Sequence, residues 1–216
     1  MITDRTFQLL AELDGNNNKE WFDAHREEVR HFVQNPFEGL LEMVSTKLAD
    51  AELPLSGGRQ TTFRMNRDVR FSADKRPYNS HVSGVLTPSG TKSEKGGLVY
   101  VHLGPDGGFL AGGHYKLPPK ELGPIRDRIV ERPDAFRRVL DDLADAGLKL
   151  CREVTLKSMP QGYADHADAW FAEHLKLQAY FVRRDLGLDE WKSDAVARAV
   201  ARFAQDCAGL IRFGER

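Results

Sequence analysis

The sequence predicts an α+β fold in which an antiparallel β-sheet with a central hairpin packs against N-terminal helices and a long C-terminal helix. Three observations support it. Apolar side chains recur at helical spacing in residues 1–58, they alternate with polar ones in residues 61–71, and residues 98–114 have the pattern of a hairpin. A doubly wound parallel sheet would need regular strand–helix alternation and a glycine-rich first turn, and the sequence has neither.

The composition is that of one globular domain. The chain has 216 residues, of which 41% are hydrophobic and 29% are charged, which excludes a disordered chain. A single domain of residues 1–216 is long enough to bury a sizeable core. We expect a helical N-terminal region at residues 1–53 and a β-rich region at residues 61–115. A helical pair is expected at residues 118–146, and a mixed region that ends in the long helix at residues 148–216.

Charge and cysteine content limit the environment and the partners. The formal net charge is −1, so binding of nucleic acid through bulk charge is not expected. Neither Cys151 nor Cys207 has a cysteine nearby, which predicts free thiols and a reducing, cytoplasmic location. No signal peptide is recognisable, and no stretch approaches the roughly 20 apolar residues of a membrane span, so no membrane association is expected.

Three helices are expected at the start of the chain. Thr3 can cap the first, which ends near Leu13, and the second follows the asparagines at 16–18. Asn35 and Pro36 are typical of an N-cap and a first helical residue, so a third helix is expected to begin there and to run to about residue 52.

The remaining elements follow from periodicity and turn residues. Strands are expected at residues 61–71, 81–87, 98–103, 109–114, 148–156 and 178–184, and the third and fourth form a hairpin around the Pro-Asp-Gly turn. Helices are expected from about residue 118, from residue 133, at residues 168–174 and, as the long C-terminal helix, at residues 190–211.

A basic segment supplies the first candidate site. Residues 59–76 carry a charge of +4, and Arg64, Asn66, Asp68 and Arg70 would share the polar face of one strand. Arginines on such a face can hold a phosphate or a carboxylate through forked hydrogen bonds. Arg67 would lie on the apolar face as an internal, structural anchor. In the alternative interpretation, the acidic N-terminal helices dock on this segment and its charges pair internally.

The turn after this segment adds two candidate ligand-binding residues. Lys75 and the Tyr78 hydroxyl, with Arg76, could converge on an anion at the end of the strand. The alternative is structural: Asp74 caps a turn and Tyr78 packs on the sheet.

The hairpin adds imidazoles. If Leu98 lies opposite His114, the side chains of Tyr100, His102 and His114 share one face. With Asp68 nearby, the two histidines could perform acid–base chemistry, and Asp68, His102 and His114 are therefore the candidate catalytic residues. Two histidines without a third ligand do not predict a metal site. No motif identifies a cofactor, because no phosphate-binding loop, dinucleotide fingerprint or nucleophile elbow is present.

Several stretches resemble one family. They are Asn17–Phe22, Arg67–Tyr78, Gly112–Tyr115, and Pro160–Tyr163 with Asp165 and His166. In order and spacing they are similar to the domain of unknown function 2461 of bacteria and fungi, over nearly the whole chain. The resemblance implies one α+β domain and implies no activity.

Two functional hypotheses follow. In the first, the protein binds a small anionic ligand on the polar sheet face, where an enzyme would use a histidine or Asp68 to move a proton. In the second, it is a non-catalytic interaction module, and its Arg/Asp motif is a structural ion-pair network. Neither the ligand nor the oligomeric state is identified by the sequence.

Overall fold

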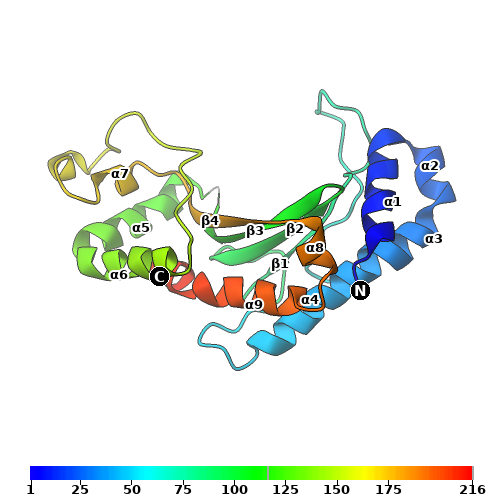
Figure 1. Cartoon of the computed structure of the whole chain (residues 1–216). Coiled ribbons are helices and arrows are strands. Elements are labelled where there is room, and N and C mark those ends of the chain that lie inside the picture. Colours follow the sequence, from blue (N-terminus) through cyan, green and yellow to red (C-terminus); the bar gives the residue numbers. More distant parts are fainter. Residues whose placement is uncertain (116, 216) are drawn as a thin grey trace.

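The structure, a computed structural model, describes residues 1–115 and 117–215. At its centre is an antiparallel sheet of four strands that follow one another in chain order (Figure 1). The strands are β1 (Val82–Leu86), β2 (Leu98–Gly104), β3 (Gly107–His114) and β4 (Tyr180–Leu186). The predicted α+β fold with an antiparallel sheet and a central hairpin is therefore confirmed.

The N-terminal helices form a nearly continuous run. They are α1 (Asp4–Gly15), α2 (Lys19–Ala24), α3 (Arg26–Val29), the π-helical turn η1 (Arg30–Gln34) and α4 (Asn35–Leu48). The helix α4 begins at Asn35 as expected, but Asn35 has helical backbone angles of −61° and −45°, so its expected role as an N-cap is wrong and α4 continues directly from η1. Pro36 cannot donate to the carbonyl of Phe32 one turn earlier, and the Thr6 hydroxyl of α1 donates to that carbonyl at 2.7 Å instead. The proline thus creates an acceptor that α1 satisfies.

One face of the sheet packs on helices. In Figure 1, α4 and α9 (Val196–Asp206) run beneath the sheet, and α10 (Ala208–Gly214) continues along the same side. Glycines in the strands permit this close approach. A Cβ added to Gly112 would lie 2.5 Å from the Cys207 sulfur, and one added to Gly84 would lie 2.7 Å from a methyl group of Leu41.

The other helices lie around the ends of the sheet. They are α5 (Pro119–Glu131), α6 (Pro133–Asp145), the 3-10 turn η2 (Ala164–His166), α7 (Ala172–Leu175) and α8 (Leu188–Lys192). The expected C-terminal helix is divided into α8, α9 and α10, because Ser193 is extended with a ψ of 140° and a second break follows at Cys207. Among the described residues, no helix is both long and apolar enough to cross a membrane.

Two expected strands, at residues 61–71 and 148–156, are irregular segments. The first meets β1 at the Thr62–Gly84 bridge, where the Phe63 amide donates to the Ser83 carbonyl at 2.8 Å. It then folds back on itself, and the Arg67 amide donates to the Pro77 carbonyl at 2.8 Å. The second meets β4 at a single bridge from Leu150 to Val182, and a further bridge joins Thr155 to Leu177, in the segment before β4.

Candidate functional site

The register of the β2–β3 hairpin decides which histidines meet. Only two residues separate Gly104 from Gly107, and His102 therefore lies opposite Phe109. Gly107 has a φ of +116°, a conformation that glycine adopts without steric cost. This register is one residue away from the expected one, so the side chain of His114 lies on the opposite face of the sheet from that of His102.

His114 is buried against the C-terminal helices. Its side chain is only 2% exposed, and its Nε2 donates to the carbonyl of Ile211 at 3.0 Å. Burial lowers the pKa of this imidazole, which makes it neutral at pH 7. The expectation that Tyr100, His102 and His114 share a face is wrong, because only Tyr100 and His102 do so.

A row of planar side chains crosses the other sheet face. The ring centroids of His81 and His102 are 4.2 Å apart, and those of His102 and Phe109 are 4.7 Å apart with an interplanar angle of 18°. The guanidinium carbon of Arg183 lies 4.0 Å from the Phe109 ring centroid. These four residues, which we call the planar row, come from β2, β3, β4 and the residue just before β1.

Gly84 and Gly112 face the helices beneath the sheet, and by the alternation of side chains along the paired strands the planar row lies on the opposite face. In Figure 1, α4 and α9 lie on the other side of the sheet. The members of the planar row are partly exposed, and the side chain of Arg183 is 42% exposed. Arg183 also forms an ion pair with Asp185 at 2.8 Å. A ligand on this face would therefore meet two imidazoles, a phenyl ring and a guanidinium.

Burial keeps the two imidazoles neutral. Burial, with smaller contributions from the nearby His81 and Arg183, lowers the pKa of His102 to about 4. Burial and the charge of Arg67 lower the pKa of His81. The Tyr100 hydroxyl lies 3.3 Å from His102 Nδ1, which orients that ring. A bound anion would reverse the electrostatic balance and favour the protonated imidazoles.

Sequence reasoning missed His81, Phe109 and Arg183 as site residues. His81 precedes Ser83 by two residues, and Ser83 lies opposite His102 in the β1–β2 pair, so the side chains of His81 and His102 share a face of the sheet. Finding His81 required the pairing of β1 with β2, and that pairing depends on the tertiary structure.

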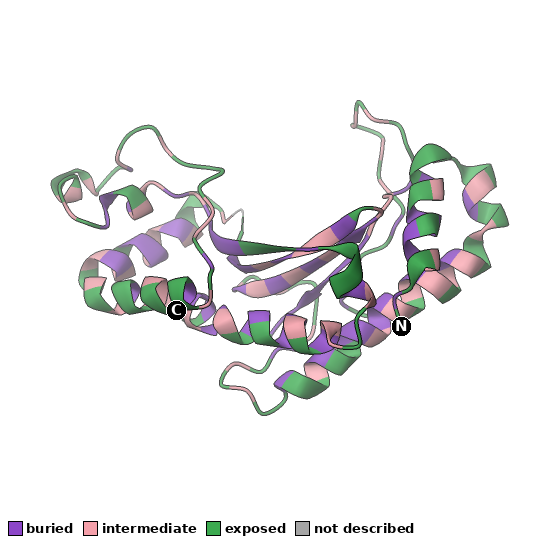
Figure 2. Ribbon diagram, in the orientation of Figure 1, coloured by how far each residue is buried: buried purple, intermediate pink, exposed green. Residues whose placement is uncertain are grey.

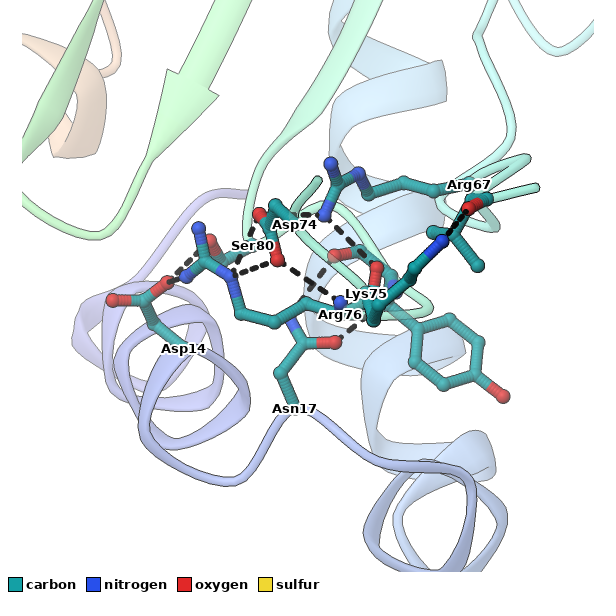
Figure 3. Close-up of polar contacts among 9 residues, drawn as sticks. Asp14, Asn17, Arg67, Asp74, Lys75, Arg76 and Ser80 are labelled. Atoms are coloured by element: carbon teal, nitrogen blue, oxygen red, sulfur yellow. Dashed lines mark hydrogen bonds and ion pairs between the residues drawn. The ribbon is translucent and has the colours of Figure 1, made fainter. Parts of the chain in front are cut away.

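The motif that resembles the family lies in the loop at residues 63–80, which rises beside the sheet at the upper right of Figure 1. Most of this loop is exposed or of intermediate burial, shown in green and pink in Figure 2. Figure 3 shows how the loop is fixed to α1. Arg76 forms ion pairs with Asp74 and with Asp14 of α1, each at 3.0 Å, and the Ser80 hydroxyl donates to Asp14 at 2.7 Å. Arg67 completes the network through an ion pair with Asp74 at 2.8 Å.

Two further contacts fix the same loop. The Asn17 side chain accepts from the Tyr78 amide at 3.0 Å and donates to the Tyr78 carbonyl at 2.9 Å. The Tyr78 ring stacks on Phe22 at 3.9 Å and is 6% exposed. The backbone amide of Arg76, followed by the two arginine side chains, lowers the pKa of the Asp74 carboxyl to about 2. The carboxylate is therefore ionised at pH 7 and can bind both guanidinium groups.

The other candidate residues of the basic segment occupy this loop instead of a strand face. Asp68 and Arg70 pair with each other at 2.7 Å, with side chains 47% and 76% exposed. Lys75 donates to the carbonyl of Val69 at 3.1 Å. Arg64 is exposed, and Asn66 forms a bridge with Tyr78 in the fold-back of the loop. The expected shared strand face of Arg64, Asn66, Asp68 and Arg70 is therefore wrong.

The chemistry available on the open face is that of neutral imidazoles beside a cation. Within the described residues, no group of three or more histidine, cysteine, aspartate or glutamate side chains could hold a metal ion. The imidazoles and the Tyr100 hydroxyl can donate or accept hydrogen bonds, and Arg183 can add a charged donor. This combination suits an oxyanion.

Comparison with known proteins identifies the family of the chain. No curated protein and no solved structure matches it. A family model described as "Conserved hypothetical protein (DUF2461)" matches residues 5–213, which includes the planar row, the loop at residues 63–80 and the helices beneath the sheet. The chain therefore belongs to the DUF2461 family.

Proposed function

We propose that the protein binds a small ligand bearing a phosphate or a carboxylate group on the open face of the sheet. The planar row is the observation that carries this proposal, because it brings Arg183 and two imidazoles together on a face that no helix of the described chain covers. Arg183 would supply charge-assisted hydrogen bonds to the anion. The imidazoles would supply neutral donors and would gain protons as the anion binds.

In this proposal the Arg/Asp motif and the planar row have different roles. Arg67, Asp74 and Arg76 hold the loop on α1, and His81 follows that loop directly. The loop therefore positions His81 against His102. If the protein is an enzyme, His102 is better placed than Asp68 to exchange a proton with the ligand, because Asp68 pairs with Arg70 in the exposed loop.

Thermal unfolding against a panel of phosphates and carboxylates tests the proposal. A ligand at about 100 times its dissociation constant should stabilise the wild-type protein by about 2.7 kcal/mol. That corresponds to roughly 5–10 °C in the midpoint for a chain of this size. The Arg183→Gln and His102→Phe variants should lose the shift. The matched control is Arg198→Gln, an exposed arginine on α9 beneath the sheet.

Affinity should also rise as the pH falls, because the anion stabilises imidazolium. The proposal fails if no panel member shifts the midpoint of the wild-type protein, or if Arg183→Gln and His102→Phe retain the shift that Arg198→Gln shows. A pH-independent shift would exclude the two histidines as ligand-binding groups.

The loop network favours a second function, that of a non-catalytic interaction module. The ion pairs of Arg76 with Asp14 and Asp74 support the structural role of the Arg/Asp motif on which this alternative is based. If no ligand of the panel shifts the thermal midpoint of the well-folded wild-type protein, this alternative is favoured. A protein partner that binds the wild type and does not bind an Arg70→Ala variant would support it further.

A further inference from the structure

A groove with four arginines lies between α5, α6 and α10, away from the planar row. Its volume is about 560 Å³, within the range of small-molecule sites. Arg128 and Arg132 reach it from the end of α5, Arg138 from α6, and Arg212 from α10. The only acidic side chains among the groove residues are Asp142 and Glu215, so the lining has an excess of positive charge.

Two of the four arginines are already engaged. Arg128 donates to the carbonyl of Phe213, and Arg212 forms an ion pair with Glu52, which comes from the segment after α4. Within residues 1–115 and 117–215, no hydrogen bond or ion pair involves the side chain of Arg132 or Arg138, and both side chains are exposed. The groove therefore holds two guanidinium groups that are available to an anion.

The groove also has an apolar side. Val139 and Ala135 of α6 line it together with Phe213 of α10, whose ring is partly exposed. The guanidinium carbon of Arg128 lies 6.0 Å from the Phe213 ring centroid. A ligand with both a phosphate group and an apolar or planar part fits such a lining, because the arginines can bind the phosphate while the rest contacts carbon.

We propose that this groove is a second binding site, for small molecules that carry a phosphate group. Arg132 and Arg138 bind the phosphate through forked, charge-assisted hydrogen bonds. Val139 and Phe213 contact the organic part. The site is independent of the open sheet face, since it shares no residue with the planar row.

Isothermal titration calorimetry with inorganic phosphate, pyrophosphate, ADP and adenosine tests this proposal at low ionic strength. Pyrophosphate and ADP should bind the wild-type protein at millimolar concentration or below, and adenosine should not. An Arg132→Gln/Arg138→Gln double variant should weaken both by about tenfold or more, because each lost bond to a charged group costs at least that much. The matched control is Arg198→Gln/Arg202→Gln, which removes two exposed arginines from α9.

Each outcome is informative. ADP that binds more tightly than pyrophosphate supports a contribution from the apolar side, and equal affinities support recognition of the phosphates alone. The proposal is overturned if neither compound binds the wild-type protein, or if the double variant binds as the control does. An equal loss in both double variants would also overturn it, because net charge would then explain the binding. Loss of ADP binding in Arg183→Gln, with Arg132→Gln/Arg138→Gln unaffected, would assign the ligand to the sheet face.

Discussion

The imidazoles of His81 and His102 lie with ring centroids 4.2 Å apart and with both pKa values lowered. Burial is the main cause for both imidazoles, and the proximity of His81 adds to the effect on His102, so the folded chain favours the neutral forms. This relationship links the stability of the fold to pH.

Acid should destabilise the protein through His102. Its pKa falls from 6.5 to about 4 on folding, so between these values the unfolded chain binds more protons than the folded one. The free energy of unfolding should therefore decrease as the pH falls from 7 towards 4. His102→Phe, which keeps a stacked ring, should remove part of this decrease, about 1 kcal/mol after allowance for partial exposure.

Urea unfolding at pH 7 and at pH 5 measures this effect. His31→Gln is the control, because His31 lies exposed on η1. The buried His114 should leave a residual pH dependence in His102→Phe, since its pKa is also lowered. An unchanged pH dependence in His102→Phe would contradict the assignment of a neutral His102.

Thr6→Val should destabilise the packing of α1 on the following helices. Valine keeps the shape of the fully buried threonine but leaves the Phe32 carbonyl without the donor that Pro36 cannot replace. The substitution also removes the acceptor of the Thr3 amide, and the two lost hydrogen bonds should together cost about 1–3 kcal/mol, to be measured by urea unfolding. Thr46→Val is the control, because the Thr46 hydroxyl is exposed and donates within its own helix. If the two substitutions lowered the free energy of unfolding equally, the hydrogen bond from Thr6 to Phe32 would not contribute more to stability than an exposed one.

Gly112→Ala should separate β3 from α9. The new Cβ would lie 2.5 Å from the Cys207 sulfur, and overpacking of this kind costs about 1–3 kcal/mol. The thermal midpoint should fall, and a Cys207→Ala substitution in the same chain should restore part of the loss. Gly123→Ala in α5 meets nothing within 4 Å and should be neutral or stabilising, because alanine favours a helix. A Gly112→Ala protein as stable as Gly123→Ala would refute the close packing.

Asp14→Asn should release the loop at residues 63–80 while leaving the core folded. The substitution weakens the contacts of Asp14 with Arg76 and Ser80. We expect faster trypsin cleavage within the loop and faster amide exchange there, with little change in the thermal midpoint, because these side chains are partly exposed. Asp50→Asn, which changes an exposed aspartate outside the network, is the control. Unchanged cleavage rates in Asp14→Asn would show that other contacts hold the loop.

The class of the fold and most strands could be predicted from periodicity and turn residues. β2 and β3 follow from alternation around a Pro-Asp-Gly turn, and that signal is local. The register of this pair cannot be predicted from the local sequence, because the same turn residues are compatible with hairpin loops of two residues or more, and each loop length gives a different register. The structure selects the register that places Gly112 against Cys207, and this contact joins segments far apart in the chain.

The candidate site was predictable only in part, for the same reason. Tyr100 and His102 share a face in any register, since they lie two residues apart on one strand. His114 changes face with a shift of one residue, and Arg183 comes from a strand whose neighbour could not be assigned. The alternation in residues 61–71 predicted a strand, but hydrogen bonds within the loop outweigh that pattern after Met65.

The two irregular segments that were expected to be strands lie along the two outer strands of the sheet. Thr62 and Phe63 occupy backbone groups of β1, while Leu150 and Cys151 occupy those of β4. An uncovered edge strand is a template for pairing with another chain and for aggregation. Each segment makes only isolated bridges and then turns away, so it occupies part of an edge without becoming a new edge itself. The backbone groups that these bridges occupy are not available for pairing with another chain.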